Sequence, residues 1–155
     1  MFSGMLTSKS ALEAIGFLDE LVPAYQEWET SIRLSRICRF VHIREPLFIY
    51  HCNQGDTISG DSVRAVAGYR YIVEKFREDI ISRLGTEAYD AHLRFCALKA
   101  MKIGELPLAE TVLGLTSSCS FKTTLIRWIC MVGRGGGARL ARLAAEAMTR
   151  CLGSR

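Results

Sequence analysis

The 155-residue chain has the length of one ordinary domain, and 49% of its residues are hydrophobic, which excludes a disordered polymer. Its most apolar stretch, 125–132, is interrupted by Arg127 and is far shorter than the roughly 20 residues that a spanning helix needs. The net charge of +4 is unevenly divided, with five basic and eight acidic residues in 1–62 but seven basic and one acidic in 122–155. The basic end therefore predicts an anionic partner.

Two short helices are predicted near the start of the chain. Ser10-Ala11-Leu12-Glu13 has the spacing of a capping box, and Gly16 can close a helix over 8–15 in the left-handed region. After a turn at Pro23, Trp28 and Ile32 lie four residues apart on one face of a second helix over 24–37.

The next segment is rich in β-branched and aromatic residues. Residues 40–43 and 47–50 lie on either side of Glu45-Pro46, which predicts two short strands separated by a turn. A polar loop is expected over 53–61.

From Ser62 the pattern is helical. Apolar residues recur at spacings of three and four up to Leu84, and Gly85 is expected to end this helix. Thr86 can cap a second helix that ends at Gly104, and Pro107 can open a third. Short loops between such helices predict antiparallel hairpins.

The last part of the chain begins with a Gly-rich stretch, 134–137, which is expected to be a flexible break. Residues 137–152 then predict an amphipathic helix whose apolar stripe lies opposite Arg139, Arg142 and Arg150. Such a helix can lie on anionic lipid, and packing against the preceding hairpins is an equally open alternative.

Several short motifs follow one another in the first 60 residues, and their order and spacing carry more information than any one of them. They are Gly16-Phe17-Leu18-Asp19-Glu20, Gln26-Glu27-Trp28-Glu29, Arg33-Leu34-Ser35 and Glu45-Pro46-Leu47, followed by Tyr50 and Ile58-Ser59. As a set they resemble the acceptor-binding, C-terminal half of family 2 (GT-A type) nucleotide-sugar glycosyltransferases. The resemblance implies a predominantly α, α+β fold, with an acceptor-side half over 1–61, helical hairpins over 62–133, and a Gly-rich linker with a basic amphipathic helix over 134–155.

By this resemblance Glu27 matches the catalytic base, which removes the proton of the acceptor hydroxyl, and Gln26 and Trp28 line the acceptor site. A carboxylate in the first turn of a helix is also stabilised in its charged form, as a general base requires. The family acid is usually Asp, and the metal-linked histidine of the family falls near Asn53, with His51 two residues early. His51 and Asn53 are therefore weak metal candidates.

The resemblance implies Mg or Mn as the metal of the complete enzyme. It implies a nucleotide-sugar donor and a glycan or lipid-linked acceptor, used in cell-surface polysaccharide synthesis, and no nucleic acid. These 155 residues contain no Asp-x-Asp motif and no counterpart of the nucleotide-binding half, so we expect the isolated chain to be inactive.

The scattered cysteines and the lack of a signal peptide predict a cytoplasmic protein. The basic amphipathic helix would allow peripheral binding at the inner face of the membrane, and apolar faces near Phe40 and Phe48 that the missing half would cover favour homo-oligomers. The alternative function is a non-catalytic helical interaction or membrane-surface module.

Overall fold

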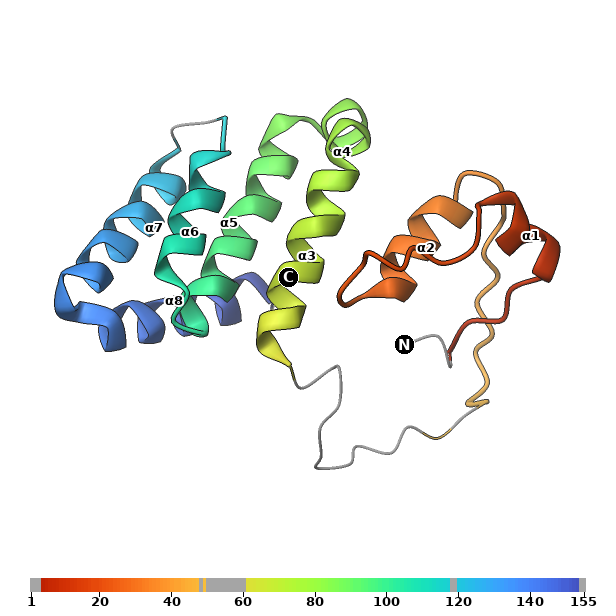
Figure 1. The fold of residues 1–155 in the computed structure, drawn as a ribbon, viewed down its shortest axis with the longest axis horizontal. Coiled ribbons are helices and arrows are strands. Elements are labelled where there is room, and N and C mark those ends of the chain that lie inside the picture. Colours follow the sequence, from red (N-terminus) through yellow and green to blue (C-terminus); the bar gives the residue numbers. More distant parts are fainter. Residues whose placement is uncertain (1–3, 48, 50–60, 118–119, 154–155) are drawn as a thin grey trace. The chain divides into compact units, whose positions relative to one another are not determined.

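The structure is a computed structural model that describes residues 4–47, 49, 61–117 and 120–153. The chain divides into two compact units, residues 1–68 and 69–155 (Figure 1). The secondary structure of the described residues is helical, so the predominantly α class is confirmed. Within these ranges, no helix has both the length and the apolarity required to cross a membrane.

The first unit contains the two short helices, α1 (Lys9–Ala14) and α2 (Gln26–Leu34). The cap of α1 is Ser8, whose hydroxyl accepts a hydrogen bond of 3.2 Å from the amide of Ala11. The predicted capping box at Ser10 is wrong, because the helix has already begun at Lys9 and a capping residue must have the extended backbone that Ser8 adopts.

Gly16 ends α1 as predicted, in the left-handed region with φ of +74°. The Gly16 amide donates to the carbonyl of Glu13 at 3.0 Å, and the Phe17 amide donates to that of Leu12 at 2.8 Å. These two bonds are those of a Schellman motif, which satisfies the last carbonyls of the helix. They also set the direction in which the chain leaves α1 toward α2.

The predicted strands are not formed in the described residues. Residues 40–43, Leu47 and Ile49 have no strand structure, while Phe48, Tyr50 and the expected loop residues 53–60 lie outside the described residues. A strand is stabilised by hydrogen bonds to a neighbouring strand, and the described residues 39–47 make no backbone–backbone hydrogen bond. The strands were predicted from composition alone, and the described residues provide no neighbouring strand with which this segment could pair.

The remaining helices are α3 (Ser62–Lys75), α4 (Arg77–Leu84), α5 (Thr86–Lys102), α6 (Leu106–Gly114), α7 (Phe121–Val132) and α8 (Ala138–Gly153). The single helix predicted up to Leu84 is broken at Phe76, whose φ of −101° and ψ of 20° leave the helical region while its ring is buried. Gly85 and Gly104 end α4 and α5 with positive φ, as predicted. Pro107 lies in the first turn of α6, also as predicted.

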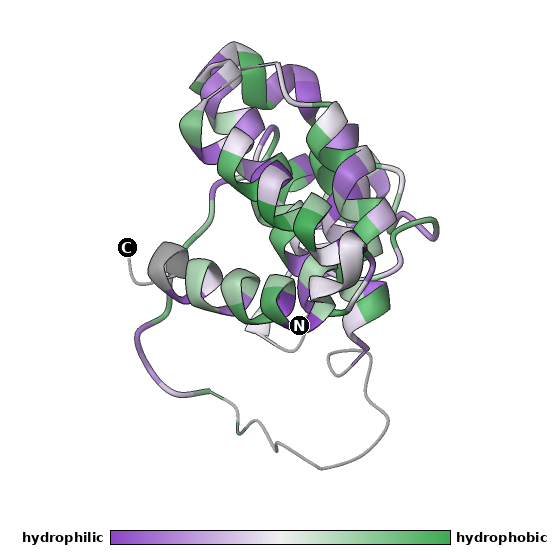
Figure 2. Ribbon diagram, turned by 90° about the vertical axis from the view of Figure 1, so that its left-hand side faces the viewer, coloured by the Kyte–Doolittle hydropathy of each residue, from purple (hydrophilic) through white to green (hydrophobic). Residues whose placement is uncertain are grey.

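Helix α5 is the centre of the second unit, since it contacts α4, α6, α7 and α8. Figure 1 shows α5, α6 and α7 side by side, with α8 running crosswise to them. The buried residues of α5 are apolar over most of its length, and in Figure 2 apolar segments alternate with hydrophilic ones along the helices. Burial raises the pKa of the Cys96 thiol in this helix to about 11.

The Gly-rich stretch between α7 and α8 is not an open linker. Residues Gly133–Gly137 form a kinked π-helical segment, and Gly136 alone leaves the helical region with φ of 112°. Gly133 is buried, and a Cβ atom placed on it would lie 2.7 Å from Cβ of Ala141 and 3.1 Å from Cδ1 of Leu106. The absence of a side chain at Gly133 therefore lets α8 turn back onto the unit.

Gly133→Ala should lower the free energy of unfolding by about 1–3 kcal/mol, because the added methyl group meets the backbone-fixed Cβ of Ala141. Gly135→Ala is the matched control, since its Cβ would meet nothing within 4 Å, and it should change stability by less than about 0.5 kcal/mol in the unfavourable direction. Urea unfolding followed by circular dichroism measures both. Equal stability of the two variants would show that Gly133 is not closely packed.

Candidate functional site

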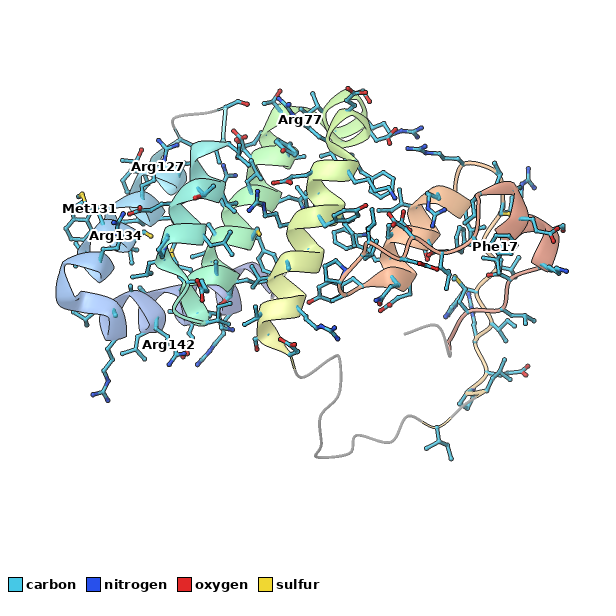
Figure 3. The ribbon with its side chains drawn as sticks, in the orientation of Figure 1. Phe17, Arg77, Arg127, Met131, Arg134 and Arg142 are labelled. Carbon is cyan, nitrogen blue, oxygen red and sulfur yellow. The ribbon has the colours of Figure 1, made fainter. Side chains whose placement is uncertain are left out.

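The candidate site is the first turn of α2, where Gln26, Glu27 and Trp28 follow one another. The residue before the helix, Tyr25, has φ of 64° and ψ of 35°, a left-handed conformation that bulky side chains rarely adopt. Phe17, labelled in Figure 3, is also at positive φ. Of the two non-glycine residues with this strain in the described chain, Phe17 therefore lies within one motif of the resemblance and Tyr25 directly precedes another. Strain of this kind is concentrated at functional sites.

An aromatic pair lies beside the candidate base. The rings of Tyr25 and Trp28 pack edge to face, with centroids 6.4 Å apart and planes at 83°. Such a pair offers an apolar face of the kind that packs against a sugar ring. Trp28 thus has a geometry that suits the role that the resemblance implies.

Glu27 is half-buried in the first turn of α2. Burial raises the pKa of this carboxyl, but the positively charged terminal amino group of the chain and a hydrogen bond from the backbone amide of Glu27 itself lower it by more, so the net shift is downward. Glu27 is therefore ionised at neutral pH. A general base must be in this state to accept a proton.

Gln26 is fastened to the preceding loop, since its side-chain amide Nε2 donates to the carbonyl of Val22 at 3.1 Å. This bond spans the turn around Pro23 and holds the start of α2 in place.

The residue that sequence reasoning missed is Glu29. Its side chain is fully buried, and its two oxygens accept from Nε and Nη2 of Arg33 at 2.7 and 2.8 Å. Arg33 Nη1 also donates to the carbonyl of Ile15 at 2.6 Å, at the end of α1. The i, i+4 spacing of a glutamate and an arginine on one helix was the available signal. The pair fixes α2, and with it Glu27, against α1.

Glu29→Gln should lower the free energy of unfolding by about 3 kcal/mol, because it leaves the partly buried Arg33 without its bidentate partner. Glu74→Gln is the control, since Glu74 forms an i, i+4 pair with Arg70 of equal length, 2.7 Å, but at an exposed position. It should cost less than about 1 kcal/mol. Thermal unfolding of both variants tests this, and similar midpoints would contradict a structural role of the buried pair.

A metal site is not visible in the described residues. Neither His51 nor Asn53 is among them, and the part of the chain that is described holds no group of three His, Cys, Asp or Glu side chains suited to a metal ion. The divalent metal thus remains an expectation from the resemblance.

The basic residues of the last helix have different surroundings. Nε of Arg142 donates to the carbonyl of Lys102 at 2.7 Å and caps α5, Arg150 lies 3.9 Å from Glu146, and Arg139 is exposed. The face of α8 that packs on the unit is made by Ala141 and Ala145, which are buried. Of the two alternatives for this helix, lipid binding and packing against the hairpins, packing is therefore seen for the side of α8 that carries the small side chains. Leu140 and Leu143 of the predicted stripe are exposed instead.

A second cluster of titratable groups lies in the other unit. The hydroxyl of Tyr69 is 2.7 Å from Nδ1 of His92, and the Tyr69 ring also contacts that of Phe95. Burial lowers the pKa of His92 below its ordinary value. The ammonium of Lys99 lies 5.8 Å from the centroid of the Tyr69 ring and 5.2 Å from that of the Phe95 ring, so the hydrogen bond belongs to a packed cluster of aromatic rings and a cation.

The lowered pKa of His92 predicts a pH dependence of stability. The folded state binds the proton less well than the unfolded state, so the contribution of His92 is present above the unfolded pKa of about 6.5 and is lost as the pH falls through that value toward the folded pKa. Urea unfolding at a series of pH values should show this loss in the original chain and a smaller one in His92→Gln. Parallel pH profiles of the two proteins would contradict it.

No protein-family model, curated protein or solved structure matches this chain. The candidate site therefore depends on two observations, the order of its motifs and the geometry at the start of α2.

Proposed function

We propose that the chain is the acceptor-side half of a family 2 (GT-A type) glycosyltransferase, with Glu27 as general base. The enzyme would transfer a sugar from a nucleotide-sugar donor to a glycan or lipid-linked acceptor. The observation that carries the proposal is the position of Glu27, half-buried in the first turn of α2, beside an aromatic pair and within the ordered set of motifs.

In the proposed reaction the Glu27 carboxylate takes the proton of an acceptor hydroxyl as the oxygen attacks the anomeric carbon. The new bond from oxygen to carbon forms while the bond from that carbon to the nucleotide diphosphate breaks, and the diphosphate leaves with the electron pair. Its negative charge must be neutralised by groups outside the residues described here. Trp28 would hold the apolar face of the acceptor sugar, and Gln26 would accept from one of its hydroxyls.

The donor-binding half would have to come from another polypeptide segment, and the extended stretch after α2 offers a surface for it. Large apolar side chains of this stretch are exposed, among them Phe40 and Val41, the latter by 86%. They accompany a backbone without hydrogen-bond partners among the described residues 39–47. Extended segments that are rich in apolar and β-branched residues can add as a strand to the edge of a sheet in another segment or chain.

The test is a chimera in which residues 1–61 replace the corresponding half of a characterised family 2 transferase, assayed by release of the nucleotide diphosphate. Glu27→Gln should lower turnover by about 100-fold to 10,000-fold, since an amide of similar size cannot accept a proton. Glu27→Asp, which restores the usual acid of the family, should retain most activity. Glu20→Gln, at an exposed position of the same unit, is the control.

Near-normal turnover of Glu27→Gln would remove Glu27 from the mechanism. The isolated chain should show no saturable binding of nucleotide-sugars in the presence of Mg²⁺ or Mn²⁺ by calorimetry. Micromolar binding would place a donor site in this chain and would contradict the division into two halves.

A second candidate function is a non-catalytic module that binds the membrane surface. It is supported by exposed apolar side chains on the outer side of α7, among them Phe121 and Trp128.

A further inference from the structure

Helix α7 is apolar on two opposite sides. Its inner side is buried through Thr123, Ile126 and Cys130. Its outer side carries Phe121, Leu125, Trp128 and Val132, whose spacings of four, three and four place them in one narrow strip of a helix. A helix that borders solvent normally has polar residues on its outer side.

This outer strip is exposed. Phe121 is 80% and Trp128 58% accessible, and Met131 at the edge of the strip is exposed as well. In Figure 3 Met131 lies on the side of α7 away from α6. Exposed aromatic and aliphatic side chains gathered in one strip mark an interaction surface. We call this strip, with Met131, the α7 outer face.

The charges around this face show which partner it fits. Residues 121–150 contain six basic side chains and one acidic one, Glu146. Lys122 follows Phe121 directly, and it is exposed and without a hydrogen bond or ion pair in the described part of the chain. Other arginines are used internally, since Arg127 and Arg142 donate to carbonyls at the ends of α6 and α5, and Arg134 forms an ion pair with Glu110 of α6.

A second copy of the chain is a poor partner for this face. A two-fold contact brings the same patch of both copies together, so Lys122 and its basic neighbours would approach their own equivalents. An anionic bilayer supplies the opposite charge, and the Phe, Trp and Leu side chains of the strip are those that insert at a lipid interface.

We propose that the α7 outer face binds the surface of an anionic lipid bilayer, with Phe121 and Trp128 inserted between the head groups and Lys122 at the lipid phosphates. Helix α8, in which Ala141 and Ala145 are buried, packs against α5 and α7. The inference does not depend on glycosyl transfer, and it shifts the membrane contact from the last helix to α7.

The test uses the full chain and co-sedimentation with vesicles of mixed phosphatidylcholine and phosphatidylglycerol. Phe121→Ser combined with Trp128→Ser should lower the partition coefficient at least about tenfold, because two large apolar side chains leave the interface. Leu140→Ser combined with Leu143→Ser removes two exposed apolar side chains of α8 and is the matched control, which should stay within about twofold of the original chain. Circular dichroism confirms that each variant is folded.

Two further measurements distinguish an anionic bilayer from a second copy of the chain as the partner of the α7 outer face. In a Trp28→Phe background, the emission of Trp128 should shift to the blue when these vesicles are added. Binding should weaken with added salt and be much lower for vesicles of phosphatidylcholine alone. Equal loss in both double variants, binding that is insensitive to salt, or self-association that disappears in the Phe121 and Trp128 variant would each overturn the proposal.

Discussion

The first unit depends on the buried ion pair between Glu29 and Arg33. An unpaired buried carboxylate is costly, so the pair is stable only with the full set of bonds that Arg33 makes, including the one to the carbonyl of Ile15. Because that carbonyl belongs to the end of α1, the pair sets the distance between the two short helices. Glu27 lies two residues away on the same helix and takes its position from this anchor.

The ends of helices were predicted correctly from the sequence where a single residue determines the backbone conformation. Gly16, Gly85 and Gly104 end their helices because only glycine adopts positive φ without strain, and that signal is contained in one residue. The cap of α1 was misplaced by two residues, since Ser8 and Ser10 are equally good caps until the first turn is formed. The strand over 40–43 was wrong because pairing is non-local, and no residue in 40–43 reports whether a partner strand exists.

The candidate site shows the same division. Glu27, Gln26 and Trp28 were assigned from the order of the motifs, and the structure places all three in one turn. The role of Glu29 was not assigned, because its spacing to Arg33 is equally typical of an exposed helix pair, and burial follows from tertiary packing. In the same way, the sequence left open whether the apolar stripe of α8 packs inward or lies on lipid, and which apolar side of α7 is buried depends on the neighbouring helices.

Helix α8 reaches back to α5 across a long stretch of chain, and Arg142 and Lys102, which it joins, are 40 residues apart in sequence. The contacts among α4, α5 and α6 are between neighbours in the chain. Since the entropy cost of closing a loop grows with its length, we expect these hairpins to form early during folding and α8 to dock last. On a ribosome-bound chain that has not yet released residue 138, the residues of α5 that α8 contacts in the folded unit are therefore still uncovered.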